Sequence, residues 1–399
     1  MKYPFWGLLV VVPILCFLSC ASDPPSATDI LDASRFRIIS PYSGIDWENH
    51  GQYKAALHVH TTRSDGRNTL AEMIEEHYAQ GFDILAITDH DVLNIDWVTG
   101  ADALTQARYN EIITGANRGG RGMLRIPLTN EQSRGQHVNT FFANFNNARG
   151  DNLRRNVGRA EQLGGISHIN HPGRYTGGRM PGWLGVSASN NRYTIRTYVE
   201  LFMEFPSLLG LEIVNRWDRE SINDRILWDN ILRETIPQGR FVWGFSNDDS
   251  HEAARVGYSF NIFVMPANTL DNFRDAMVYG RFYAVARSAR RELGRDFVGS
   301  GPFPAIRNII VDDDIASITI VAEHYTSIDW IYGGDVIAQG NTISVVHHQG
   351  NIGSYVRANI IGPGGISFTQ PFGITRNKGQ HSLPWRYLFY AAVLGIVRN

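Results

Sequence analysis

Short apolar runs alternate with amphipathic stretches between about residues 53 and 286. This pattern is typical of repeated strand and helix units around a parallel sheet. It predicts seven strands, over residues 55–60, 83–88, 124–129, 165–169, 211–214, 241–245 and 281–286. Seven such repeats favour an α/β fold in which the strands form a closed or nearly closed barrel.

The clearest helix is predicted over residues 70–80. Thr69 and Glu72 have the spacing of a capping box, and Gly81 stands where a helix ends. The apolar face of this helix consists of Leu70, Met73, Ile74 and Tyr78. Further helices are predicted over residues 101–113, 153–162, 194–205, 222–235 and 270–279.

The pattern changes after the turn sequence Gly299-Ser300-Gly301-Pro302. Short alternating segments separated by glycine-rich turns predict a small antiparallel β-sandwich over residues 303–375. The barrel domain is therefore expected over residues 45–298. Residues 376–399 form a tail whose apolar part, 387–397, is too short to cross a membrane.

The N-terminus has the features of an export signal. Lys2 precedes an apolar run over residues 5–18, and Cys20 follows almost at once, as in the lipobox of bacterial lipoproteins. We therefore expect a signal peptide over residues 1–20, a lipid on Cys20, and a tether over residues 21–44. The protein is then exported and anchored to a membrane. A simple cleaved signal and an uncleaved anchor are the alternatives.

Charge and cysteine content narrow the chemistry. The 399 residues include 37 basic and 39 acidic side chains, so no strong field attracts nucleic acid, and any affinity for phosphate must be local. The two cysteines, Cys16 and Cys20, both lie in the N-terminal segment. The exported part has no thiolate ligand, so a transition metal must be bound by nitrogen and oxygen.

Histidine and acidic residues gather at the ends of the predicted strands. His58 and His60 are two positions apart on one strand, so their side chains point the same way. The further candidates are Asp65, Asp89, His90, Glu131, His168, His171, Asp249 and His251. Because the carboxyl ends of parallel strands meet at one mouth of a barrel, these clusters are expected to meet in space. Imidazole and carboxylate together favour zinc, iron or manganese.

This ordered set resembles the polymerase and histidinol phosphatase (PHP) domain. The resemblance rests on His58-Val59-His60-Thr61, Ser64-Asp65-Gly66, Ile87-Thr88-Asp89-His90, Glu131, His137, Asn170-His171-Pro172 and Asp249-Ser250-His251. It covers roughly residues 52–290. It implies a distorted seven-stranded barrel, written (β/α)7, with two or three divalent ions.

The resemblance also implies a distribution of ligands. His58, His60 and Asp249 hold one ion, and Asp65, His90 and His251 hold a second. Glu131 bridges ions, with His137 and His171 completing a third site. Two features depart from the pattern: Asp65 stands where some members have histidine, and His168 lies outside the motif.

The predicted function is metal-dependent hydrolysis of a phosphate ester, by a phosphatase or phosphodiesterase that acts on a small phosphorylated compound or an exposed phosphodiester. Two neighbouring cations lower the pKa of a bound water from 15.7 towards about 7, which supplies hydroxide at neutral pH. Arg174, with Arg216 as a second candidate, is expected to bind the phosphate through its guanidinium. His168 or Asp89 is expected to protonate the leaving group or to orient a ligand.

Two other readings of the sequence stay open. Related barrels with similar ligands hydrolyse amides, lactones or phosphotriesters. The barrel is alternatively a metal-stabilised scaffold in a protein that binds surface polymers through its sandwich. The number of ligand residues favours an enzyme, because a structural site usually fills its coordination sphere with fewer residues and one ion.

Overall fold

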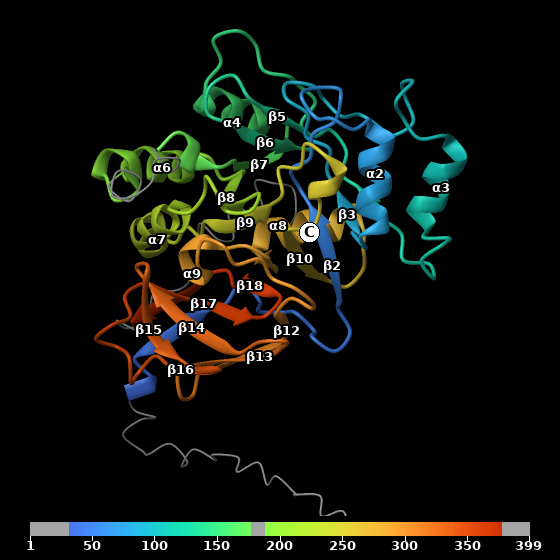
Figure 1. The fold of residues 1–399 in the computed structure, drawn as a ribbon. Coiled ribbons are helices and arrows are strands. Elements are labelled where there is room, and N and C mark those ends of the chain that lie inside the picture. The colour runs from blue at the N-terminus through green and yellow to red at the C-terminus, as the bar shows by residue number, and fades with distance from the viewer. Residues whose placement is uncertain (1–31, 177–187, 377–399) are drawn as a thin grey trace, which may run out of the picture.

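The computed structural model describes residues 32–176 and 188–376. The predicted signal peptide over residues 1–20 and the tail beyond residue 376 lie outside these ranges. Within them the chain has a mixed α/β fold, in which the larger helices lie around the outside of the strands (Figure 1). No helix in the described ranges has the length and apolar character needed to span a bilayer.

The strands that precede the helices belong to two separate sheets. The first contains parallel β2 (Gly51–Ala56), β3 (Ile84–Leu85) and β4 (Leu124–Arg125), extended by antiparallel β10 (Ser259–Met265) and β11 (Phe282–Ala286). The second has the order β5 (Asn130–Gln132), β6 (Val138–Phe141), β7 (Ile166–Ile169), β8 (Leu208–Asn215) and β9 (Trp243–Asn247). In it β7, β8 and β9 run parallel to one another.

The expectation of a closed barrel is therefore corrected, since the strands at the seven predicted places lie in two sheets and form no single cylinder. β9 lies beside β10, but side chains replace the backbone ladder there: Asn261 donates to the carbonyl of Ser246 and accepts from its N–H. On the other side only isolated bridges join the sheets, one of them between His90 and Glu131. The side chain of Asn261 thus replaces the ladder at one seam and isolated backbone bridges replace it at the other, so ladder hydrogen bonds close neither.

A strand lies at or overlaps each of the seven predicted places, although β3 and β4 are only two residues long. The strands β5, β6 and β10 were not predicted. Both β6 and β10 pair antiparallel with their neighbours, so they do not follow the strand and helix alternation on which the prediction rested. Periodicity alone does not separate such short apolar runs from other buried segments.

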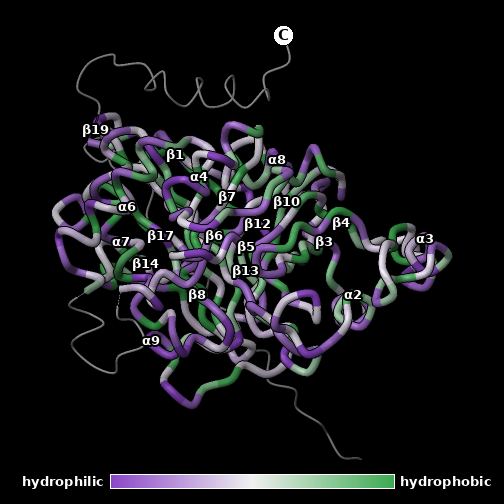
Figure 2. The backbone as a smooth tube through the Cα atoms, turned by 90° about the horizontal axis from the view of Figure 1, so that it is seen from above, coloured by the Kyte–Doolittle hydropathy of each residue, from purple (hydrophilic) through white to green (hydrophobic). Residues whose placement is uncertain are grey.

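The six predicted helices are all present. They are α2 (Leu70–Ala79), α3 (Gln106–Thr114), α4 (Leu153–Gln162), α6 (Arg192–Glu204), α7 (Asp224–Thr235) and α8 (Leu270–Tyr279). The capping box of α2 is confirmed, because Thr69 accepts from the N–H of Glu72 while the Glu72 carboxylate accepts from the N–H of Thr69. Helix α3 buries only Ile112 and lies at one edge of the molecule, away from the strands (Figure 2).

The C-terminal strands are antiparallel, as predicted, but they are not separate from the rest. A three-stranded sheet contains β12 (Ala305–Asp312), β13 (Ser317–Glu323) and β16 (Thr342–Ser344). The remaining strands are β14 (Ser327–Tyr332), β15 (Asp335–Gln339), β17 (Tyr355–Gly362), β18 (Gly365–Phe368) and β19 (Phe372–Arg376). Because β18 pairs with β11, the first sheet continues into these remaining strands, across the boundary expected between the barrel domain and the sandwich.

The expected tether is also corrected in part. Strand β1 (Phe36–Ile39) lies within residues 21–44 and pairs with β19 along its whole length. Phe36 and Ile38 are buried against the C-terminal strands. Burial of these apolar side chains and a full backbone ladder explain why this segment is ordered.

Candidate metal centre

All nine residues that the resemblance marks as ligands lie together at one rim of the fold. Their ligand atoms form four overlapping groups. The groups are His58, His60 and Asp249; His60, Asp65, His90 and His251; His58, Glu131 and His171; and His90, Glu131 and His137. Within each group the atoms lie within 4.8 Å of one another.

The first group is centred on Asp249. Its Oδ1 lies 3.1 Å from Nε2 of His60 and 3.4 Å from Nε2 of His58. Ligand atoms about 2.0 to 2.2 Å from a shared ion stand about 2.8 to 3.1 Å from one another in octahedral geometry and about 3.3 to 3.6 Å in tetrahedral geometry. The observed separations therefore match donors that surround one cation.

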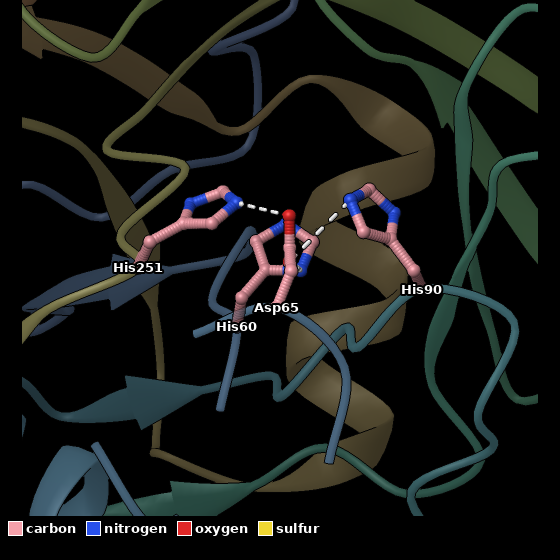
Figure 3. Close-up of side chains that lie close together, drawn as sticks. All are labelled: His60, Asp65, His90 and His251. Carbon is pink, nitrogen blue, oxygen red and sulfur yellow. Dashed lines mark hydrogen bonds and ion pairs between the residues drawn. The ribbon is translucent and has the colours of Figure 1, made fainter. Parts of the chain in front are cut away.

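Asp65 occupies the centre of the second group. Figure 3 shows its carboxylate between the rings of His90 and His251, with His60 behind it. Nε2 of His251 lies 3.2 Å from Oδ2, and Nε2 of His90 lies 3.6 Å from Oδ1. This carboxylate is the most exposed of the ligand candidates that form ion pairs here, at 55% of its side-chain surface. An ion in this group therefore faces the solvent.

Glu131 belongs to two groups and connects them. Its Oε1 lies 3.0 Å from Nδ1 of His137 and 3.3 Å from Nε2 of both His58 and His171. Its Oε2 lies 2.7 Å from Nδ1 of His90. A carboxylate with separate nitrogen partners on its two oxygens has the geometry of a bridging ligand.

Buried polar atoms test whether these residues fit a metal. Nε2 of His58 and Nε2 of His60 are buried and have no hydrogen-bond partner, and the same holds for Oε2 of Glu131. Such atoms are costly to bury without a partner. A cation between them removes this cost, and imidazole with carboxylate is a donor set of zinc, manganese and iron. The residues therefore fit divalent ions.

The electrostatics of the site also favour a cation. Burial raises the pKa of Glu131, but His58 and hydrogen bonds from His137 outweigh it, so that the pKa lies well below its usual range. Burial likewise works to lower the pKa of His58, yet Asp249 and Glu131 hold it well above the usual value. The carboxylates of the site thus stabilise any positive charge placed among them.

Glu212, in the middle of β8, is a functional candidate that the sequence analysis missed. It is fully buried and accepts hydrogen bonds from Nδ1 of His58 at 2.8 Å and from the N–H of His171 at 2.8 Å. The side-chain amides of Asn215 and Asn247 also donate to it. A proton on Nδ1 leaves Nε2 of His58 free to bind a metal. A single carboxylate inside the apolar run Leu208-Leu209-Gly210-Leu211 to Val214 was the available signal.

Asp89 orients a loop and does not face the ligand groups. It accepts from the N–H and the hydroxyl of Thr61, both at 2.7 Å, and from the hydroxyl of Ser64 at 2.6 Å. These bonds fix the loop that carries Asp65. Of the two roles expected for Asp89, the geometry therefore favours orientation of a ligand over donation of a proton.

His168 lies in the core and joins none of the ligand groups. Its ring stacks on Phe245 with centroids 4.5 Å apart and packs against Phe141. Burial lowers the pKa of His168 to about 4, so the ring is neutral at pH 7. The expected role as a proton donor is therefore not supported by this position.

The two arginine candidates differ in position. Arg174 lies in the short helix η1 (Pro172–Arg174) directly after His171, and its side chain is exposed. Arg216 contacts the site: its Nε donates to Oδ2 of Asp249 at 3.1 Å, and its Nη2 lies 3.3 Å from Nδ1 of His251. Nδ1 of His251 is only 2.9 Å from the carbonyl of Asp249, so it donates to that carbonyl. Nε2 of His251 then faces Asp65. Of the two arginines, Arg216 is therefore the one that contacts the ligand groups.

Three residues of the rim have left-handed backbone. The φ angles are 27° at His171, 56° at Arg216 and 47° at Asp249. Such conformations cost roughly 1 to 3 kcal/mol for residues other than glycine and cluster at functional sites. At the rim, two of these three residues are ligand candidates and the third is Arg216, which contacts Asp249.

Comparison with known proteins supports the family resemblance for part of the chain. Residues 56–154 match the PHP domain. This segment carries His58, His60, Asp65 and His90, as well as the bridging Glu131. No curated protein matches the sequence.

Solved structures give weaker likenesses. One is a two-domain protein from Bacteroides vulgatus described as containing a predicted PHP-like metal-dependent phosphoesterase, with 15% identity, a TM-score of 0.44, and coverage of 86% of this chain and 91% of that one. Another is a lesion-specific endonuclease from Pyrococcus furiosus, with 16% identity, a TM-score of 0.34, and coverage of 57% and 56%. A third is an amidohydrolase from Chromobacterium violaceum, with 16% identity, a TM-score of 0.33, and coverage of 57% and 96%. Because none of these TM-scores reaches 0.5, the conclusions below rest on the geometry and on the match to the PHP domain.

Proposed function

We propose that the protein is a metal-dependent phosphoesterase with two or three divalent ions. The observation that carries the proposal is the convergence of six imidazoles and three carboxylates at one rim, with Glu131 shared between two of the groups. A site that only stabilises the fold usually needs four ligands and one ion. The excess of ligand residues supports a catalytic site.

The chain assigns distinct tasks to its residues. His58, His60 and Asp249 would hold one ion, Asp65, His90 and His251 a second, and Glu131 with His137 and His171 a third. Divalent ions held in this way act as Lewis acids and lower the pKa of water. Glu212 keeps the proton of His58 on Nδ1, and Asp89 fixes the loop of Asp65. Arg216 is placed to bind a phosphate oxygen through the guanidinium donors that Asp249 does not use.

The test begins with the form that lacks residues 1–20. Bound metal per chain is measured by atomic emission, and a panel of phosphomonoesters and phosphodiesters is then screened with zinc, manganese and iron. We expect two or three ions per chain and hydrolysis of phosphate esters. Turnover of a lactone or an amide without any phosphate ester would contradict the proposal.

A double variant connects metal to activity. His58→Ala with His60→Ala removes ligands from three of the four groups, so both bound metal and phosphoester hydrolysis are expected to be lost. Arg174→Ala and Arg216→Ala keep the metal, and the larger rise in KM is expected for Arg216→Ala. Wild-type metal content in the double variant would contradict the ligand assignment.

We also propose that the enzyme acts outside the cytoplasm, anchored through a lipid on Cys20. The support is the apolar run over residues 5–18 followed by Cys20. Labelling of the wild type, but not of Cys20→Ser, with a fatty acid analogue in a bacterial host is the expected result. Equal labelling of both would contradict the anchor.

A further inference from the structure

A cavity of about 240 Å³ adjoins the candidate metal centre. One wall carries three of the ligand candidates, Asp65, Asp249 and His251. The rest of the lining includes three arginines, Arg67, Arg216 and Arg255, together with Trp217 and Glu252. A leaving group attached to a phosphate at the metals would extend into this cavity.

The arginines exceed the acidic groups that are available to pair with them. Arg67 donates to Oε2 of Glu252 at 3.0 Å, and Arg255 forms an ion pair with the same carboxylate. These three side chains together carry one net positive charge. Asp249 accepts from Arg216 and, in the proposed function, both Asp249 and Asp65 bind the ions, so neither carboxylate offsets the charge of Arg67 and Arg255.

The remaining acid of the lining, Asp248, does not cancel this charge either. Its carboxylate is buried and accepts from the backbone N–H groups of Gly257, Tyr258 and Ser259. Those bonds fix the loop that follows β9, on which His251 and Arg255 both lie. The carboxylate of Asp248 is therefore bonded to the backbone, and the cavity keeps an excess of cationic donors.

The guanidinium of Arg255 is held in place, because it stands 4.5 Å from the ring centroid of Trp217 and pairs with Glu252. That of Arg67 is anchored through Glu252 on a side chain that is 76% exposed, and the backbone N–H of Arg67 donates to the carbonyl of His251 at 2.7 Å. Arginine fixed over an aromatic face is a preorganised partner for a carboxylate or a phosphate. The fixed position lowers the entropy cost of binding an anion.

We propose that this cavity is a subsite for a second anionic group, so that the substrate is a small phosphate ester whose leaving group carries its own carboxylate or phosphate. The inference rests on the proposed function for the position of the first phosphate. Arg216 binds the phosphate at the metals, and Arg67 and Arg255 bind the second anion. A cavity of about 240 Å³ has room for a small leaving group of roughly ten to fifteen non-hydrogen atoms.

Equilibrium binding tests the subsite without relying on turnover. The full chain in detergent, loaded with the metal that it retains, is titrated by calorimetry with benzylphosphonate and with 4-carboxybenzylphosphonate, neither of which has a P–O ester bond to hydrolyse. We expect the carboxylated probe to bind at least tenfold more tightly. In Arg255→Met and in Arg67→Met this preference is expected to fall to threefold or less.

Two further variants make the test specific. Glu252→Gln releases both arginines from their shared partner, so the preference for the carboxylated probe is expected to increase. Arg196→Met is the matched control, because Arg196 is an exposed arginine of α6 that pairs with its own glutamate, Glu200. Equal binding of both probes by the wild type overturns the proposal, and so does an equal loss for both probes in Arg255→Met.

Hydrolysis separates this proposal from the function on which it rests. Phenyl phosphate and 4-carboxyphenyl phosphate are compared by kcat/KM with the metal-loaded chain. A preference of at least tenfold for the carboxylated ester supports the subsite. Equal hydrolysis of the two esters overturns the subsite and leaves the proposed phosphoesterase function intact. If neither ester is hydrolysed, the subsite and the proposed function are both overturned.

Discussion

Asp229, beneath the C-terminal sheet, and Glu131, at the rim, are both fully buried carboxylates, but their partners differ. Asp229 receives two parallel hydrogen bonds from Arg357, at 2.8 and 2.7 Å, and a third from the hydroxyl of Tyr355. Glu131 is surrounded mainly by imidazoles, and the ion pairs that the described residues form with it all come from histidines, the shortest from Nδ1 of His90 at 2.7 Å. The chain thus supplies a permanent positive charge in one region and leaves the other to a cation from outside.

A second buried cluster repeats the first arrangement. Arg225 binds both oxygens of Asp218, and its Nε donates to Glu292 at 2.7 Å. Arginine stays charged at any pH that a folded protein tolerates, so these pairs do not depend on a ligand. Buried charge near the C-terminal sheet therefore stabilises a packing arrangement, while buried charge at the rim creates a binding site. Substitutions at the rim should therefore reduce the bound metal, whereas substitutions near the C-terminal sheet should lower stability and leave the bound metal unchanged.

The largest effect is expected from Glu131→Gln. Loss of the shared carboxylate weakens at least two of the groups, so metal content falls and phosphoester hydrolysis drops roughly a thousandfold. Without metal, this variant should also lose some stability, because the surrounding imidazoles hold the pKa of Glu131 well below its usual range and so favour its charge in the folded state. Emission spectrometry and denaturant unfolding of the metal-free forms check both parts. Glu161→Gln in α4, which changes a remote carboxylate bonded to the N–H of Ser207, is the control and should retain its metal.

Asp229→Asn should lower the free energy of unfolding without any loss of bound metal. The substitution leaves Arg357 buried without its counter-charge, and breaking such a pair costs about 3 to 5 kcal/mol of unfolding free energy. Metal content per folded chain should stay at the wild-type value, since Asp229 belongs to none of the ligand groups. Denaturant unfolding of the metal-loaded protein measures the change. A loss below about 1 kcal/mol would contradict the comparison.

Glu212→Gln should weaken metal binding by about 10- to 100-fold. If the new amide oxygen faces the N–H of His171, its NH2 group faces Nδ1 of His58 and forces the proton onto Nε2, the atom that binds metal. If the amide is flipped, its NH2 group faces the N–H of His171, and two donors meet. Competition with a metal-binding dye gives the affinity. Unchanged affinity would show that Glu212 does not set the tautomer of His58.

The smallest effect concerns an imidazole with no carboxylate partner. His77 is buried in α2 and donates to the carbonyl of Met73, and burial lowers its pKa to about 4. Between its usual pKa of about 6.5 and pH 4 the unfolded chain takes up a proton that the folded chain refuses, so stability falls by about 1.4 kcal/mol per pH unit as the pH drops. Above pH 6.5 this group has no effect on stability.

The measurement compares unfolding free energy at pH 6.0 and 5.0. In His77→Leu the loss over this interval should be about 1.4 kcal/mol smaller than in the wild type. His324→Asn, a change at an exposed histidine with left-handed backbone, is the control and should leave the slope unaltered. An identical slope in His77→Leu would show that His77 is protonated in the folded state.

The sequence by itself determined most of the local structure. The caps of α2 and the six helices follow from patterns within a few residues of each position, and the place of His58, His60, Asp65, His90 and the later ligand candidates at or after strand ends predicted their convergence. Helix caps and strand ends depend on local hydrogen bonds and side-chain periodicity, which a sequence displays directly. The assignment of these residues as ligands stays a prediction.

Only the tertiary structure decided which groups face one another. It placed His168 between Phe141 and Phe245, turned Asp89 towards Thr61, and brought Glu212 under His58 although 154 positions separate them. It also divided the strands expected in the barrel between two sheets, because the side chain of Asn261 replaces the ladder at one seam and isolated backbone bridges replace it at the other. These outcomes depend on contacts between distant segments and on the cost of burying charge. Local periodicity indicates neither of them.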